Sequence, residues 1–319
     1  MRINNGATHR PQVLFGPYGT RLEQIGTKIG QPNLADPHAI LNGSECIRAV
    51  REVAGSYLDS GAGIATVNAF GLRRFVEEKG GARDYSDAMN LNVRALQTAI
   101  NSVGKRARVV ASLGPGRDCY EPEQALNRAE AVDFHRHQAA EAKSARADLA
   151  WFETVNTIEE AVGIALAAKA AKVPCLISFV IGKNGQLLSG ESIKDAIEAV
   201  DKTSGNYPQG FSFNCCAIED LEPALQACGS KVSRVVALYP NASSRPHHEL
   251  NGSHGISGVI DSFRTALYLN YLAQRYGLEI IGGCCGYTPK DIAEISFVVR
   301  QGLWSSGLPP SDLVQGNRI

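Results

Sequence analysis

The sequence predicts a closed (β/α)8 barrel, or TIM barrel, formed by one domain over residues 1–319. Short apolar runs rich in β-branched residues alternate with longer segments of helical periodicity, which is the pattern of repeated βα units. Eight such units can be counted along the chain, the number that a closed barrel needs. An open, doubly wound sheet is the alternative, but it usually carries a glycine-rich phosphate loop such as G-x-G-x-x-G, and the chain has none. No linker rich in proline or serine divides the chain.

The expected strands are short apolar runs, each of about the usual strand length. In chain order they are Gln12 to Gly16, Gly63 to Phe70, Arg108 to Gly114, Asp148 to Thr154, Val173 to Val180, Gly210 to Cys215, Ser233 to Tyr239 and Leu278 to Gly283.

Capping signals mark several of the helices between these strands. Ser44 can cap the first helix, Thr157 precedes Glu160 in the spacing of a capping box, and Pro289 fits a first helical turn behind Thr288. The expected helices are Ser44 to Ser60, Tyr85 to Val103, Glu123 to Ala147, Thr157 to Lys172, Glu191 to Lys202, Glu219 to Ala227, Ser257 to Tyr276 and Pro289 to Gly302.

The composition excludes several classes of protein. The chain has 32 Lys and Arg against 32 Asp and Glu residues, so its net charge is zero and we expect no nucleic-acid partner. With 44% hydrophobic and 20% charged residues it is neither disordered nor fibrous. The first ten residues are polar and no run of about 18 apolar residues occurs, so we expect a cytoplasmic protein without a membrane partner. A homo-oligomer is compatible with the sequence, although no apolar stripe identifies one.

Two adjacent pairs of cysteines are the first sign of chemistry. Cys215 and Cys216 end the sixth expected strand, and Cys284 and Cys285 follow the eighth. In a reducing cytosol such pairs indicate soft-metal or thiol chemistry more often than structure. A closed barrel brings strands six and eight to nearby parts of one rim, where the active sites of this fold lie. A vicinal disulfide within a pair, or buried free thiols, is the structural alternative.

Three thiolates from these pairs are suited to Zn²⁺. Three protein ligands leave a fourth position for a substrate thiol, which loses its proton on the metal and becomes a nucleophile near neutral pH. Strict alternation along the sixth strand places Cys215 on the same face as Phe211 and Phe213. Cys216 then lies on the opposite face with Asn214. One cysteine of this pair is therefore expected to reach the metal, and alternation does not decide which.

The chain resembles the homocysteine S-methyltransferase family, which includes the betaine–homocysteine methyltransferases. Residues 211–216 (FSFNCC) and 281–286 (IGGCCG) are similar to the two zinc-binding motifs of this family. Further elements of the family follow in the same order at residues 19–23 (GTRLE), 66–70 (TVNAF), 112–116 (SLGPG), 153–154 (ET) and 239–241 (YPN). Each element alone is weak, but their order together with both cysteine motifs is specific, and the resemblance covers most of the chain.

The resemblance implies a zinc ion held by Cys215, Cys284 and Cys285, with the sulfur of homocysteine as the fourth ligand. It implies methyl transfer from an onium donor to this thiol, giving methionine. We favour S-methylmethionine or S-adenosylmethionine as the donor and place a betaine-type donor next, whereas cobalamin-coupled folate chemistry would need further domains.

Glu153 matches the family position whose carboxylate binds the ammonium group of the acceptor. A carboxylate there could instead cap a helix, or serve as a general base in an enzyme without metal.

Other residues at strand ends are candidates for substrate contact. Asn68 and Asn214 are expected to donate hydrogen bonds, with a purely structural role as the alternative. The ring of Tyr18 is expected to lie near a cationic methyl donor, because aromatic faces attract cations. Trp151 and Tyr287 also stand at strand ends, where packing is the expected role.

One departure from the family concerns the acceptor. Where the family usually carries Asp before its Gly-Gly or Gly-Ala, this chain has Phe15, and a phenyl ring cannot accept hydrogen bonds from an ammonium group. The acceptor could therefore be another thiol, held differently. A non-catalytic barrel that binds zinc or thiols is the alternative function. His247 and His248 lie in a polar loop beside Pro246, where solvation is expected rather than metal binding.

Overall fold

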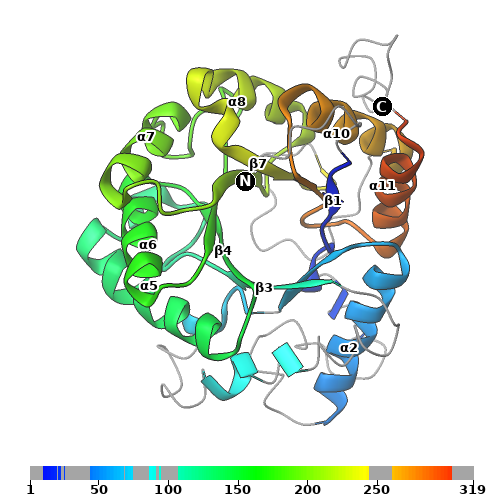
Figure 1. The fold of residues 1–319 in the computed structure, drawn as a ribbon, viewed down its shortest axis with the longest axis horizontal. Helices are drawn as coiled ribbons and strands as arrows, with labels where there is room; N and C mark the ends of the chain where they lie inside the picture. The colour runs from blue at the N-terminus through cyan, green and yellow to red at the C-terminus, as the bar shows by residue number, and fades with distance from the viewer. Residues whose placement is uncertain are drawn as a thin grey trace.

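The expected (β/α)8 barrel is confirmed by a single sheet of eight parallel strands inside a ring of helices (Figure 1). The computed structural model describes residues 10–19, 21, 22, 25, 44–67, 69–74, 86–90, 93, 94, 107–243 and 261–303. The strands are β1 (Gln12–Val13), β2 (Ile64–Val67), β3 (Arg108–Leu113), β4 (Leu149–Val155), β5 (Cys175–Phe179), β6 (Gly210–Asn214), β7 (Val235–Tyr239) and β8 (Ile280–Ile281).

The sheet closes between its first two strands. The strand order is β1-β8-β7-β6-β5-β4-β3-β2, and a parallel bridge between Leu14 and Ile64 joins the two ends. Two backbone hydrogen bonds extend this bridge, from Phe15 N to Ile64 O at 3.0 Å and from Gly63 N to Val13 O at 2.9 Å. β1 is shorter than the expected 12–16, since the chain turns away at Gly16 and Pro17 has no N–H to continue a ladder.

The helices lie on the outer face of the sheet. They are α2 (Ser44–Asp59), α5 (Arg128–Ser144), α6 (Ile158–Ala171), α7 (Ile193–Ser204), α8 (Leu221–Ala227), α10 (Ser262–Tyr276) and α11 (Pro289–Gln301), with 3₁₀ turns η2 (Pro122–Gln124), η3 (Ile218–Asp220) and η4 (Gly229–Arg234). Of the helix expected over residues 85–103, only 86–90, 93 and 94 are described, and they are helical. None of the helices in the described ranges is long and apolar enough to cross a membrane.

The start of α5 corrects one expected boundary. The helix was expected from Glu123 but begins at Arg128, because Asn127 caps it: the Asn127 side chain accepts hydrogen bonds from the backbone N–H groups of Ala129 and Glu130. Glu130 in turn accepts from the backbone N–H of Asn127, which completes a capping box. Residues 122–124 before this cap form a 3₁₀ turn instead.

Two apolar layers hold the strand ends in place. The larger layer packs the helices on the sheet, and the smaller one fills the barrel interior with residues such as Leu149, Trp151 and Tyr239. Trp151 is fully buried, packs against Tyr239 with ring centroids 5.1 Å apart, and donates from its ring N–H to Ser212 Oγ at 3.0 Å. The barrel is thus closed below the ends of β4, β6 and β7, and chemistry is confined to its open rim.

Candidate metal centre and substrate pocket

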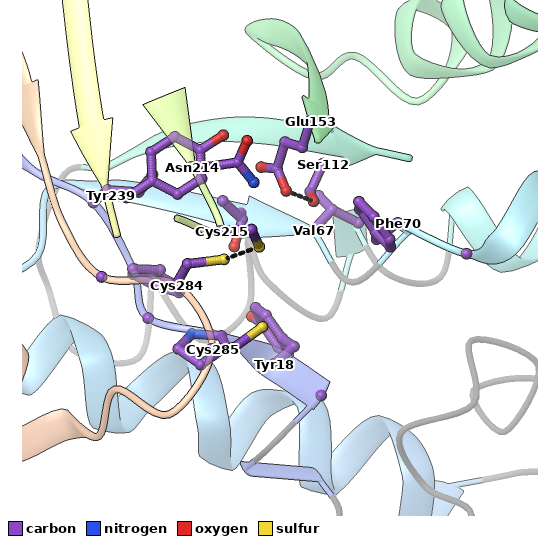
Figure 2. A pocket seen from close by; sticks show the side chains of 18 residues that line it. Tyr18, Val67, Phe70, Ser112, Glu153, Asn214, Cys215, Tyr239, Cys284 and Cys285 are labelled. Carbon is purple, nitrogen blue, oxygen red and sulfur yellow. Dashed lines mark hydrogen bonds between the residues drawn. The ribbon is translucent and has the colours of Figure 1, made fainter. Parts of the chain in front are cut away.

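A cavity of about 330 Å³ opens at the carboxyl ends of the strands. Its walls come from the ends of β2, β3, β4, β6 and β7 and from the segments that follow β1 and β8. Figure 2 shows three cysteine side chains at its centre, with Tyr18 on one side and Asn214 and Tyr239 on the other. Residues far apart in sequence meet here, as expected for the functional rim of this fold.

The three cysteines come from the ends of β6 and β8. The Sγ atoms of Cys215 and Cys284 lie 2.8 Å apart, and the sulfur atoms of Cys215, Cys284 and Cys285 all lie within 4.8 Å of one another. Backbone hydrogen bonds fix the segment after β8, from Cys284 N to Pro240 O at 2.7 Å and from Ala242 N to Cys285 O at 2.9 Å. Among the described residues this is the group that could hold a metal ion.

A left-handed residue at the end of β6 decides which cysteine of the first pair faces the pocket. Cys215 has φ of +51°, so the regular alternation of the strand stops there. Cys215 lines the pocket together with Asn214, while Cys216 packs in the outer apolar layer with Phe211 and Phe213. The prediction that Cys215 shares a face with Phe211 and Phe213 was therefore wrong, because it assumed extended backbone through residue 215.

The thiols share hydrogen bonds in a way that favours one anion. The pKa of Cys285 is lowered well below its usual value by hydrogen bonds from Cys215 and Cys284 to its thiolate. The pKa of Cys215 is raised well above its usual value by its hydrogen bonds to Cys284 and Cys285 and by burial. A bound cation would remove this difference by stabilising all three as thiolates. The donor set therefore fits a soft divalent metal such as zinc.

Spacing is the second test of the fit. Four sulfur ligands at about 2.3 Å from a tetrahedral zinc ion lie about 3.8 Å from one another. The Cys215 and Cys284 sulfurs, at 2.8 Å, share a thiol hydrogen bond and would have to separate by about 1 Å to bind it. That is a side-chain adjustment, since the backbone positions already bring all three sulfurs together.

Two glycines after β8 allow the backbone to place Cys284 and Cys285 in the pocket. A Cβ atom at Gly283 would meet the ring of Tyr287 at 2.0 Å, and one at Gly282 would meet Leu14 Cβ at 2.7 Å. Any side chain would push the segment away from these neighbours and displace Cys284. The glycines of this motif are thus required by close approach of the backbone.

Glu153 is a buried acid on the opposite side of the pocket. It lies near the carboxyl end of β4, is 9% exposed, and accepts a hydrogen bond from Ser112 Oγ at 2.9 Å. Burial raises the pKa of Glu153 to about 8; the Ser112 hydrogen bond opposes this shift, and the Cys285 charge adds to it. A neutral acid in an empty pocket can ionise when a cation arrives beside it.

Asn214 is held by two neighbouring strands. Its Oδ1 atom accepts from Ser178 Oγ at 2.6 Å and from the backbone N–H of Thr154 at 3.1 Å. Thr154 has φ of +57°, and the ladder between β4 and β5 is irregular there. The amide nitrogen of Asn214 is buried and has no hydrogen-bond partner.

The segment after β1 forms a largely apolar wall. Phe15 and Tyr18 both line the pocket, with ring centroids 6.4 Å apart, and Phe15 also packs on Tyr57 at 5.4 Å. The hydroxyl of Tyr57 donates to Pro17 O at 3.0 Å and so fixes this segment. The phenyl ring of Phe15 therefore occupies the wall itself.

The remaining candidates are separated from this pocket or lie outside the described residues. Trp151 fills the barrel interior and Tyr287 packs behind Gly283, both almost fully buried. Asn68, His247 and His248 fall outside the part of the chain that the structure describes.

Two residues of the pocket had no role in the sequence-based prediction. Ser112, at the end of β3, donates to Glu153, and Tyr239, at the end of β7, places its side chain in the cavity wall. Both lie in motifs that the sequence analysis had used for the resemblance, and both stand at strand ends. Position in the barrel was the signal that could have identified them.

Comparison with known sequences points to one family. A family model described as homocysteine S-methyltransferase matches residues 12–299. Homocysteine S-methyltransferase 2 of Saccharomyces cerevisiae is 25% identical over 315 residues, covering 91% of this chain and 94% of the yeast protein. Homocysteine S-methyltransferase 1 of Arabidopsis thaliana is 26% identical over 314 residues, covering 89% and 92%. The selenocysteine Se-methyltransferase of Brassica oleracea var. italica is 25% identical over 327 residues, covering 92% and 91%.

Comparison with solved structures supports the fold. The homocysteine methyltransferase MmuM of Escherichia coli, in its metallated form, superposes with a TM-score of 0.73. The match covers 91% of this chain and 96% of that one at 22% identity.

Proposed function

The chain belongs to the homocysteine S-methyltransferase family, and we propose that it uses zinc to transfer a methyl group from an onium donor to the sulfur of homocysteine, giving methionine. The observation that carries this proposal is the meeting of Cys215, Cys284 and Cys285 within 4.8 Å, in the wall of the pocket that also contains Glu153.

We assign the metal to these three thiols. Zinc bound there would lower the pKa of a substrate thiol, so that the thiol reacts as a thiolate near neutral pH. Burial of Cys215 and partial burial of Cys284 and Cys285 keep water away from the reacting sulfur. The methyl carbon must approach this sulfur in line with its bond to the leaving group, and the pocket walls supply the alignment.

Glu153 is proposed to bind the ammonium group of homocysteine. With a pKa of about 8 in the empty pocket, the acid is mostly neutral at pH 7 and ionises as the ammonium group binds. Binding of the acceptor should therefore release close to one proton from Glu153 at pH 7, in addition to the proton that the thiol loses when it binds zinc. Ser112 keeps the carboxyl oriented through its hydrogen bond at 2.9 Å.

The donor is proposed to be S-methylmethionine or S-adenosylmethionine, with a betaine-type donor next. A sulfonium cation suits a pocket that contains a thiolate and the aromatic rings of Tyr18 and Phe70. No Lys, Arg or His lines the described part of the pocket, so no fixed positive charge opposes a cationic donor. The described cysteine side chains are free thiols, and we place the enzyme in the cytoplasm, where thiols stay reduced.

Zinc content and turnover test the proposal together. Elemental analysis of reduced wild-type protein should give about one zinc per chain, lost in Cys215→Ser and Cys284→Ser and retained in Cys216→Ser, whose side chain faces the outer layer. Methionine formation from homocysteine should require the metal and one of S-methylmethionine, S-adenosylmethionine or betaine. Bound zinc without turnover for any pair of substrates would favour the non-catalytic barrel. Absence of zinc from reduced wild-type protein would reject the metal mechanism.

A further inference from the structure

We propose that the carboxylate of the acceptor binds on the wall formed by β4, β6 and β7, where Tyr239 and Asn214 donate hydrogen bonds to it beside Glu153. This inference rests on the proposed function, because it concerns how an amino-acid thiol is held. It makes Tyr239 a residue that determines specificity for thiols with a carboxylate.

The hydroxyl group of Tyr239 is a buried hydrogen-bond donor without an acceptor. Tyr239 is 3% exposed, lines the cavity, and its Oη atom has no hydrogen-bond partner. The Ser178 hydroxyl lies near enough to oppose the rise in the pKa of Tyr239, but it donates its proton to Asn214, and no hydrogen bond of normal geometry joins it to Tyr239. A buried hydroxyl without a partner costs about 1–3 kcal/mol, so its retention beside a cavity indicates a ligand.

Asn214 supplies a second donor whose orientation is fixed. Its Oδ1 accepts from Ser178 Oγ at 2.6 Å and from Thr154 N at 3.1 Å, and the Thr154 N–H, which can only donate, requires an oxygen at that position. The Nδ2 group is therefore the atom left over, and it is buried without a partner. In Figure 2 the amide lies between Tyr239 and Glu153, above Cys215.

These two donors stand beside the one carboxyl group of the pocket lining. Figure 2 shows Tyr239 next to the amide of Asn214, on the same side of the cysteines as Glu153. Burial raises the pKa of Tyr239 well above its usual value, so its hydroxyl stays protonated and can donate. An amino-acid head carries its ammonium and carboxylate on the same carbon atom. A site for it must place an acid next to neutral or positive donors, as Glu153, Asn214 and Tyr239 do.

The side chains of the opposite wall are less suited to this role. Phe15 offers only a ring, Pro17 has no backbone N–H, and the Pro17 carbonyl is occupied by the Tyr57 hydroxyl. The Tyr18 hydroxyl also lacks a partner. Figure 2 shows Tyr18 beside Cys285, across the cysteines from Glu153, so its hydroxyl does not stand next to the acid that takes the ammonium group.

A comparison of two thiols in two proteins tests the inference. Calorimetric binding to the zinc-loaded protein would be measured for homocysteine and for 3-aminopropanethiol, the same thiol without its carboxylate. Tyr239→Phe should weaken homocysteine binding by about 10- to 100-fold, the cost of one hydrogen bond to a charged group, and should change binding of 3-aminopropanethiol by less than about 3-fold. Asn214→Asp keeps the Oδ1 acceptor and removes the donor, so it should weaken homocysteine binding while the aminothiol is spared.

Tyr268→Phe is the matched control, because Tyr268 is a buried tyrosine on α10 whose hydroxyl faces Glu222 outside the pocket. It should leave the ratio of the two dissociation constants unchanged. If Tyr239→Phe weakened the binding of both thiols equally, at unchanged zinc content, the role of Tyr239 would be structural and the inference would be overturned. Unchanged homocysteine binding would place the carboxylate elsewhere. Turnover is measured separately, so a wild-type protein that binds homocysteine but transfers no methyl group would reject the proposed function alone.

Discussion

Glu153 and Glu160 are both buried, seven positions apart in sequence, and they lie in contrasting surroundings. Glu153 lies near the carboxyl end of β4 and faces the pocket, where Ser112 donates a hydrogen bond to it. Glu160 lies in the first turn of α6 and is 1% exposed; its Oε1 atom accepts from Gly116 N at 2.8 Å and lies 3.0 Å from His135 Nε2. Glu153 can accept further hydrogen bonds from a ligand in the cavity, whereas Glu160 is enclosed by its hydrogen-bond partners.

The difference continues through their neighbours. Around Glu160, His135 Nδ1 lies 2.6 Å from Gln138 Oε1, and Gln138 donates to Gly114 O at 3.1 Å, so every polar side chain of this network is paired. Around Glu153, the Nδ2 atom of Asn214 and the hydroxyl of Tyr239 are buried without partners. A complete network stabilises the loop after β3, whereas an incomplete one marks the place where a ligand completes it.

Removing Glu160 should give the largest effect on stability. Glu160→Ala leaves the Gly116 N–H and the His135 ring buried without their acceptor, which should lower the free energy of unfolding by about 3–5 kcal/mol. Denaturant titration would measure this loss. Zinc content of the folded fraction should stay at the wild-type level, because the network does not touch the cysteines. A stability change below about 1 kcal/mol would show that the network is not structural.

Replacing Glu153 should have a smaller and opposite effect, visible only at higher pH. Its pKa is raised from 4.5 to about 8 in the folded chain, so the unfolded chain ionises first and the metal-free protein loses stability as pH rises from 4.5 to 8. Glu153→Gln cannot ionise and should be more stable than wild type by on the order of 3 kcal/mol at pH 7, with little difference at pH 4.5. Unfolding of chelated protein at both pH values measures this. Equal stability at pH 7 would mean that Glu153 has an ordinary pKa.

A left-handed residue beside the pocket should give the smallest effect. Thr154, at φ of +57°, is a β-branched residue in a conformation that favours glycine. Thr154→Gly relieves this strain but also removes a side chain that is 1% exposed, so the free energy of unfolding should change by less than about 1 kcal/mol. Acceptor binding should weaken, because a looser backbone N–H holds Asn214 less firmly. Lys172→Gly, at φ of +54° in the C-cap of α6, is the control and should stabilise the fold by about 0.5–1 kcal/mol without affecting binding. If both variants changed acceptor binding equally, Thr154 would have no specific role in positioning Asn214.

Much of the fold could be predicted from local patterns in the sequence. Alternating apolar runs and helical segments predicted the closed barrel, and the family model confirmed the resemblance that the cysteine motifs had suggested. Boundaries were less accurate where capping or proline chemistry intervened, as at Asn127 before α5 and at Pro17 after β1. Capping depends on which of several polar residues reaches the free N–H groups, and sequence spacing alone allows more than one choice.

Along the site, the sequence by itself determined that two cysteine pairs end strands of one barrel, and that an acid ends a third strand. Which cysteine of the first pair faces the pocket was decided by the positive φ of Cys215, which strand periodicity cannot represent. The unpaired donors of Asn214 and Tyr239 also emerge only in three dimensions, because a hydrogen-bond deficit is a property of all neighbours at once. Sequence specifies which groups are available; tertiary structure decides which of them remain unsatisfied in the wall of the pocket, and those are the groups that a substrate can bind.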